Sequence, residues 1–300
     1  MPINASCRTA SLLFVGLVSA AAASSQTTAS PCAPSTRGIP QRAALARGAS
    51  EFIDAVAGMT EPERDQAIRG DLLAGNMPGF LRNVLPATLM AQLPGGESVR
   101  ITLCVLADYL SIGSDTDFLR VPMGLDSALA VAERFGFTLP TRRIVDLIYR
   151  EAAVHLLPQP LPAGDQMRST PYYVAHQALI EDQRAATGAS RDALTAGHKK
   201  DIVLSSRLWS QPGRVPIYGW HRSIGAPIQP LSTVHGASYA DYSHGVRLIS
   251  NVVFVNGQPR SIYEVLADKL LSPLLSDEGP LPRAAELRTG AVALALTAGH

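Results

Sequence analysis

The sequence carries little charge and no excess of either sign. Its 300 residues include 26 lysines and arginines against 25 aspartates and glutamates, which gives a formal net charge of +1. A nucleic-acid-binding surface is built from clustered basic side chains, so this balance predicts no nucleic-acid partner. Apolar residues make up 46% of the chain, and that fraction favours a folded core over disorder.

The sequence also lacks an apolar run long enough to cross a bilayer, which takes about 20 residues. Residues 11–19 are apolar, follow the basic Arg8 and precede the alanines of 20–23. This order is typical of a secretory signal peptide. We therefore expect residues 1–23 to be removed, after Ala23 or one or two residues later. The mature protein is predicted to be secreted or periplasmic, without stable membrane insertion.

Cysteine is scarce. Loss of the signal peptide would take Cys7 with it and leave only Cys32 and Cys104. In an oxidising compartment an isolated pair is most simply interpreted as one disulfide, which would stabilise the fold by roughly 4 kcal/mol in the chain-entropy model. The alternative is two unpaired thiols, one of them buried in a strand.

The remaining chain changes character along its length. Residues 44–188 have a mostly helical pattern, with Thr60 and Glu63 as a capping box and one alternating strand at 97–106. Residues 189–277 have strand composition, and Asn256-Gly257 is the strongest hairpin-turn signal. The predicted fold class is α+β, with a mainly helical N-terminal part packed on a smaller antiparallel β-rich C-terminal part. The predicted divisions are a signal peptide (1–23), a flexible Ser/Pro-rich tether (24–43), a mainly helical subdomain (44–188), a β-rich subdomain carrying the site (189–277) and a C-terminal tail (278–300).

Histidine is concentrated in one window of the chain. Four of the seven histidines lie within 198–244, together with both tryptophans and three of the eight tyrosines; these histidines are His198, His221, His235 and His244. Histidine is the side chain that most readily acts as ligand, acid or base near neutral pH. The window therefore indicates a site, although no motif in it names a substrate.

The densest part of this window is residues 234–245, and His235, Asp241 and His244 are the candidate catalytic residues there. Glycines at 236 and 245 indicate a loop with special backbone angles. In a straight strand Asp241 and His244 would point to opposite faces, because their separation is odd. A turn across residues 242 and 243 would bring them together. The alternative is a buried polar loop in which Asp241 only caps a turn.

Four further residues are candidates for substrate binding: Trp220, Tyr239, Lys200 and Arg247. The aromatic faces suit sugar rings and apolar groups, and the cations suit a carboxylate or a phosphate. Strand alternation would place His198 and Lys200 on one face, and His221 opposite Trp220 and Tyr218. The alternatives are a core tryptophan, an ordinary surface lysine, and an arginine paired with a structural acid.

Two mechanisms fit these residue types. In the first, three or four ligands hold a zinc ion with an open position, and the metal lowers the pKa of its bound water to about 7. The candidate zinc ligands are His198, His221, His235, Asp241 and His244. In the second, no metal takes part: a histidine oriented by Asp241 acts as general base, and Ser243 or Ser238 is the nucleophile. The lack of a G-x-S-x-G motif disfavours a standard α/β-hydrolase.

The set of His235, Asp241, His244 and the Trp220-His221 pair is distantly similar to the zinc peptidases that cleave cell-wall peptides. Those enzymes carry a His with an Asp seven positions later, and a downstream Glu-x-x-His that often has a Trp before its His. Here the His-to-Asp separation is six, and the Trp-His pair lies upstream without the Glu. The resemblance covers about a dozen residues and implies only that such ligands can build an exported hydrolase.

The sequence therefore predicts an exported hydrolase acting on a cell-wall or other extracellular polymer, either peptide or glycan. The rival interpretation is a secreted, non-catalytic protein that binds polysaccharide or peptidoglycan through Trp209, Trp220, Tyr218 and Tyr239. A third is a structural protein whose polar loop serves folding alone. Convergence of the window's ligands around a cleft would favour the enzyme, a flat row of exposed aromatics the binder, and buried, mutually satisfied histidines the structural protein.

Overall fold

The structure is a computed structural model that describes residues 1–2 and 30–289. The predicted signal peptide lies outside the described residues, apart from Met1 and Pro2. Over the described part, no helix combines the length and the apolar character needed to cross a membrane.

The helices are spread along the described chain. The α-helices are α1 (Ala49–Val56), α2 (Glu61–Leu73), α3 (Leu125–Phe135), α4 (Arg142–Glu151), α5 (Thr170–Thr187), α6 (Arg207–Ser210), α7 (Ile262–Ala267) and α8 (Ser272–Leu275). The 3-10 helices are η1 (Ala33–Gly38), η2 (Gly79–Arg82), η3 (Asp165–Arg168) and η4 (Pro282–Thr289). Local signals set their ends. The Thr60 backbone N–H donates to Glu63 Oε2 at 2.8 Å at the start of α2, and Gly136, with φ 80°, ends α3.

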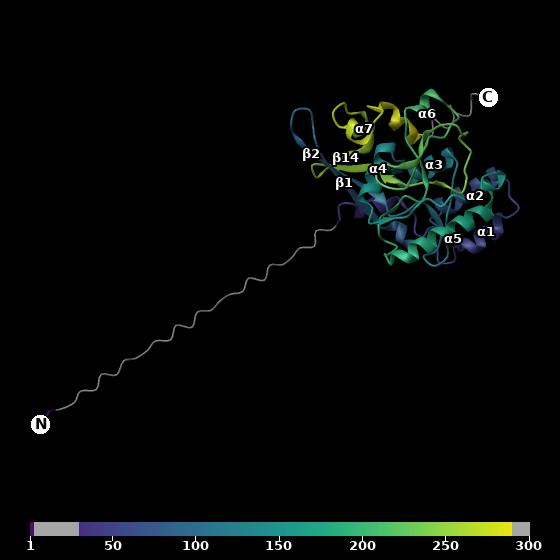
Figure 1. The fold of residues 1–300 in the computed structure, drawn as a ribbon, viewed down its shortest axis with the longest axis horizontal. Coiled ribbons are helices and arrows are strands. Elements are labelled where there is room, and N and C mark those ends of the chain that lie inside the picture. The colour runs from purple at the N-terminus through teal and green to yellow at the C-terminus, as the bar shows by residue number, and fades with distance from the viewer. Residues whose placement is uncertain (3–29, 290–300) are drawn as a thin grey trace.

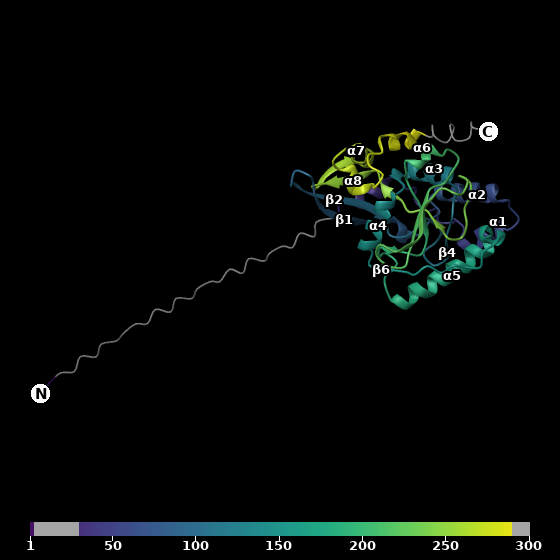
Figure 2. The same ribbon diagram turned by 45° about the horizontal axis from the view of Figure 1, so that its top comes forward.

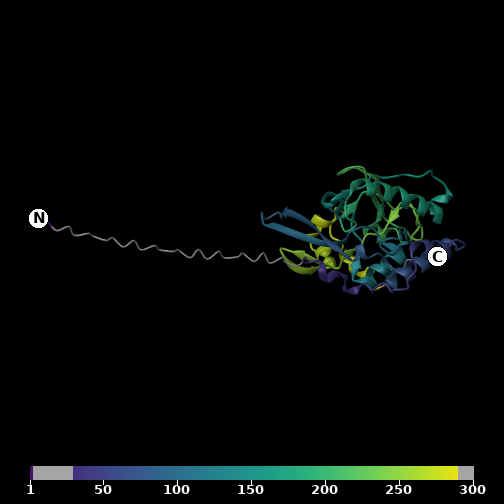
Figure 3. The ribbon, with the colours of Figure 1, turned by 90° about the horizontal axis from the view of Figure 1, so that it is seen from below.

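The main sheet is antiparallel and draws its strands from both halves of the chain. Its strands are β1 (Val84–Gln92), β2 (Ser98–Leu106), β5 (Phe137–Thr138), β12 (Ile249–Ser250), β13 (Val252–Val255) and β14 (Gln258–Ser261), in the order β14-β13-β2-β12-β5 with β1 on β2. The β1–β2 hairpin projects from the end of the molecule opposite α1, α2 and α5 (Figure 1), and the view from below shows the same extension (Figure 3).

This sheet shows that the predicted fold class is wrong. The two longest strands, β1 and β2, lie in the segment predicted to be mainly helical, where only the strand that became β2 was expected, while α7 and α8 lie in the part predicted to be β-rich. Phe254 of β13 pairs with Thr102 of β2, and Ile249 of β12 pairs with Val105. The protein is a mixed α/β structure in which helices and mostly antiparallel strands are interleaved. Figure 2 shows α7 and α8 on the opposite side of the molecule from α5.

A second sheet is built from strands of the histidine window. Its strands are β8 (Lys200–Ile202), β9 (Ile217–His221), β10 (Pro227–Ser232) and β11 (His244–Gly245), in the order β10-β9-β8-β11, with β8 and β11 parallel. Helix α4 contacts both β1 and β9, so it links the two sheets. Two short two-stranded sheets complete the fold: β3 (Ser111–Gly113) with β4 (Phe118–Arg120), and β6 (Val154–His155) with β7 (Thr195–Ala196).

The two cysteines that were predicted to pair lie at disulfide distance. The sulfurs of Cys32 and Cys104 are 2.05 Å apart, and both residues are fully buried. Cys32 precedes η1 and Cys104 lies in the middle of β2. The bond therefore ties the start of the described chain to the centre of the main sheet, and the segment from Cys32 onward, predicted to be a flexible tether, is anchored there.

Candidate functional site

A tight turn at residues 241–244 brings Asp241 and His244 together. The His244 backbone N–H donates to the Asp241 carbonyl at 3.0 Å. The Ser243 backbone N–H and its hydroxyl both donate to Asp241 Oδ1, at 2.8 and 2.5 Å. As a result, His244 Nε2 lies 3.9 Å from Asp241 Oδ2. A local turn, not a straight strand, is thus the arrangement of this segment.

His235 and Tyr239 close over this turn from the preceding loop. Their rings are stacked, with centroids 3.9 Å apart and planes 5° from parallel. The Tyr239 hydroxyl donates to Asp241 Oδ2 at 3.1 Å, and the centroids of the His235 and His244 rings are 6.2 Å apart. His235 and Tyr239 are half-buried, whereas Asp241 and His244 are buried. The group therefore extends from the interior to the surface.

Lys200 is the cation of this group because of strand pairing. In the parallel β8–β11 pair, Lys200 stands opposite His244, and it is half-buried. Its Nζ lies 5.0 Å from the centroid of the Trp220 ring. We call Lys200, His235, Tyr239, Asp241 and His244 the Asp241 cluster.

The backbone conformation at Trp220 is unusual. Its φ is 58°, and that of the preceding Gly219 is 116°; a bulky residue rarely adopts such a value. The irregularity breaks strand alternation: Tyr218 and His221 both bond to Asp146 Oδ1, at 2.8 and 2.9 Å, and therefore lie on the same side. The sequence had placed them on opposite faces, and that prediction is wrong. Backbone strain of this kind is concentrated at functional sites.

Burial and mutual charge set the protonation of the cluster. Burial lowers the pKa of His244 to about 4 against the opposing effect of Asp241, and burial also lowers the pKa of His235. Burial tends to raise the pKa of Asp241, but His244, Lys200 and the Ser243 hydrogen bonds outweigh it, and the net pKa is lowered. Near neutral pH both histidines are therefore neutral and Asp241 is a carboxylate.

The other two histidines of the window have carboxylate partners of their own. His198 Nε2 lies 3.1 Å from Asp108 Oδ1, and Asp108 forms a buried ion pair with Arg120 at 2.7 Å. His221 bonds to Asp146 on α4, as described above. The four histidines thus fall into three neighbourhoods, and only His235 and His244 share one.

Arg247 also lies away from the cluster. Its guanidinium donates to the carbonyls of Leu106 and Thr195, at 2.8 and 2.6 Å, and its Cζ lies 4.3 Å from the centroid of the Tyr109 ring. Arg247 is buried. It holds backbone carbonyls in place, and no carboxylate lies at ion-pair distance from it among the described residues, although its charge acts on the buried Asp201.

Sequence reasoning missed the side chains that support the turn from behind. Lys199 Nζ donates to the Tyr242 carbonyl at 2.5 Å and lies 3.1 Å from His176 Nδ1. Both Lys199 and His176 are buried, and burial lowers the pKa of Lys199 to about 7. A lysine next to a second lysine gave no sign in the sequence that one of them is buried.

The predicted zinc ligands do not form one site. They divide among the three neighbourhoods above, and within residues 30–289 no group of three or more His, Cys, Asp or Glu side chains is arranged to hold a metal ion. The best-formed three-residue subset, His235 with Asp241 and His244, has Asp241 already engaged by Tyr239 and Ser243. The residues present therefore do not fit a preformed zinc centre.

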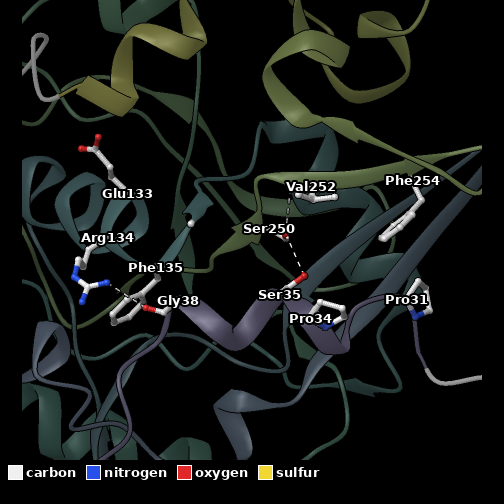
Figure 4. A pocket seen from close by; sticks show the side chains of 11 residues that line it. Pro31, Pro34, Ser35, Gly38, Glu133, Arg134, Phe135, Ser250, Val252 and Phe254 are labelled. Atoms are coloured by element: carbon white, nitrogen blue, oxygen red, sulfur yellow. Dashed lines mark hydrogen bonds between the residues drawn. The ribbon is translucent and has the colours of Figure 1, made fainter.

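Two hollows help to locate accessible surface. One, of about 440 Å³, lies between η1, the end of α3 and β13, and no predicted site residue lines it (Figure 4). Its walls include Ser35 and Ser250, whose hydroxyls are 3.2 Å apart. A second, of about 250 Å³, lies beside the loop of the Asp241 cluster and is lined by Ser238 together with residues of α2 and α3. Ser238, which precedes Tyr239, is the one residue of this loop that lines the second hollow, and the five residues of the Asp241 cluster do not line it.

Comparison with known proteins gives no further guide. No protein-family model, no curated protein and no solved structure matches this chain.

Proposed function

We propose that the protein is an exported hydrolase that acts on a cell-envelope polymer and uses the Asp241 cluster for acid–base catalysis. The observation that carries the proposal is the convergence of half-buried His235 with buried Asp241 and His244. A partly accessible neutral histidine beside a carboxylate is the usual composition of a general base.

The residues differ in their roles in this proposal. Neutral His235 accepts a proton from the water that attacks the scissile bond and returns it to the leaving group. The negative charge of Asp241 favours the protonated form of His235, which stabilises the imidazolium as it forms. Lys200 lies opposite His244 at the edge of the group and takes no part in these proton transfers. Ser243 is fully buried and donates to Asp241, so water, not Ser243, is the nucleophile.

The binding-protein alternative gains no support from the described residues. Its stacking surface required four exposed aromatic rings, but Trp220 and Tyr218 are buried, and Trp209 packs partly buried against the core. Tyr239 stacks on His235. A flat row of exposed rings is therefore not what these residues form.

The test is a polymer-cleavage assay of the purified mature protein, with peptidoglycan as the substrate. New amino groups would report peptide cleavage and new reducing ends would report glycan cleavage. His235→Gln should lower the rate by about 100-fold or more, as expected on loss of a general base, with an unchanged unfolding midpoint. His155→Gln is the matched control, because His155 is exposed on β6 and distant in sequence from the window, and it should retain full activity.

Retention of activity in His235→Gln, or absence of both kinds of new end with the native protein, would contradict the proposal. Elemental analysis of the tag-free protein accompanies the assay. The described residues as they lie do not form a zinc centre. One zinc per chain together with loss of activity on chelation would therefore require a metal-dependent mechanism in place of the metal-free one.

A further inference from the structure

Polar hydrogens without acceptors gather around Lys200. Both ring nitrogens of His244 and the indole Nε1 of Trp220 are buried and have no hydrogen-bond partner. Among the described residues, Lys200 Nζ has no hydrogen-bond acceptor and no carboxylate at ion-pair distance; it lies 5.0 Å from the centroid of the Trp220 ring. An unpaired buried donor costs about 1–3 kcal/mol. Two such donors, the Trp220 indole N–H and the one N–H of neutral His244, next to a half-buried ammonium indicate a missing partner.

The other interior cations set the contrast. Arg120 is bound by Asp108 and Glu181, Arg247 by two carbonyls, and Lys199 by the Tyr242 carbonyl. These three buried cations all have acceptors within the protein. Lys200 is half-buried and has none among the described residues, as is also true of the half-buried Arg69 and Arg260; it differs from those two in belonging to the Asp241 cluster.

The backbone holds the three donors on one face of the second sheet. The β8–β11 register sets Lys200 beside His244. The Trp220 ring lies over Lys200 Nζ and packs edge-on against His176 and Tyr242, and the Trp220 backbone N–H is fixed to the Lys199 carbonyl at 2.9 Å. Maintaining a tryptophan at a φ of 58° has an energetic cost, so the ring is held in this place against its local preference.

Asp241, the carboxylate of the cluster, already has partners. Oδ1 accepts from Ser243, Oδ2 accepts from Tyr239, and the Asp241 charge also stabilises the Lys200 ammonium. What remains without a hydrogen-bond acceptor is the Lys200 ammonium, the Trp220 indole N–H and the one N–H of neutral His244. A ligand that satisfies this set must bring acceptor oxygens.

We infer that Lys200, Trp220 and His244 form a subsite for a carboxylate group of the ligand. The identity of the ligand rests on the proposed function: the carboxylate would belong to a peptide stem or acidic sugar of the polymer, held next to His235. The recognition itself needs only an oxyanion of carboxylate size that accepts from an ammonium and from two neutral N–H groups.

The test measures binding without turnover. N-acetylalanine, its amide and inorganic phosphate are titrated into the native protein, and dissociation constants are obtained by ligand-observed NMR. The acid should bind saturably, and the amide, which lacks the charge, should bind at least tenfold more weakly. Lys200→Met should weaken binding of the acid at least tenfold, and Lys200→Arg should recover part of it. Trp220→Phe should weaken it by about tenfold. Lys269→Met, at an exposed lysine outside the sheet, is the matched control and should bind as the native protein does.

Equal affinity for acid and amide, or an unchanged affinity in Lys200→Met, would overturn the inference. Tighter binding of phosphate than of the acid would overturn the carboxylate assignment. Because binding is measured apart from cleavage, a subsite without hydrolysis would contradict only the proposed function, and hydrolysis without the subsite would contradict only this inference.

Discussion

Two polar groups of similar composition lie in this protein and are built in different ways. The Arg120 network joins Arg120 to Asp108, Glu181, Gln177 and His198. Its charges are paired within the interior, and the one polar atom left without a partner is His198 Nδ1. The Asp241 cluster also contains histidine, a carboxylate and a cation, but its cation and one of its histidines lack acceptors, and it reaches the surface.

The difference shows that the hydrogen-bond partner of a histidine indicates its role better than the local abundance of histidine in the sequence does. His198 and His221 each belong to a carboxylate on a distant segment, Asp108 and Asp146. Burial raises the pKa of Asp108, but Arg120 and His198 outweigh it, and the net pKa lies well below its ordinary value. A group that is so fully paired has little capacity left to bind a ligand.

The largest effect is expected when the central cation of the Arg120 network is removed. Arg120→Met should lower the free energy of unfolding by about 3–5 kcal/mol, because it leaves the buried Asp108 carboxylate without its ion-pair partner. Chemical denaturation measures this loss. Arg191→Met is the matched control: Arg191 binds the same Glu181 from the surface, and its loss should cost less than about 1 kcal/mol. Equal costs for the two variants would mean that the network is no more than a set of surface pairs.

A smaller effect concerns Lys199, which lies between the two groups. Burial lowers its pKa from 10.5 to about 7 in the folded protein. Between pH 7 and 10 the unfolded chain therefore binds more protons at this lysine than the folded chain does, and stability rises with pH. The expected rise is about 1 kcal/mol per pH unit, measured by denaturation at pH 7.5, 8.5 and 9.5. Lys199→Met should abolish the slope; an unchanged slope in that variant would contradict the burial of a neutral amine.

Local signals in the sequence predicted the parts of the fold that are local. The capping box at Thr60 and Glu63 starts α2, and the Asn256-Gly257 turn joins β13 to β14 with φ of 51° and 81°. The division into a helical and a β-rich part was wrong because β2 pairs with strands about 150 residues away in sequence. Strand β1 contains Pro86, which weakens a strand pattern but is tolerated here at the edge of the sheet.

The same distinction holds for the candidate site. The turn from Asp241 to His244 depends on contacts two and three residues apart, so the sequence could include it as one of two arrangements. The partners of His198 and His221 lie 90 and 75 residues away, and no spacing rule reaches them. The positive φ of Trp220 also left no mark in the sequence beyond the neighbouring glycine.

The smallest effect on stability is expected for the cation of the Asp241 cluster, Lys200. Lys200→Met removes a cation–π contact worth about 0.5–1 kcal/mol, but it also removes a half-buried charge whose pKa burial has already lowered. These contributions oppose each other, and Asp241 keeps its bonds to Tyr239 and Ser243. The free energy of unfolding should therefore change by less than about 1 kcal/mol, in the same denaturation assay that shows a large loss for Arg120→Met. A loss of about 3 kcal/mol or more would mean that Lys200 is held as firmly as Arg120, and the Asp241 cluster would then be a second structural network instead of a site that awaits a ligand.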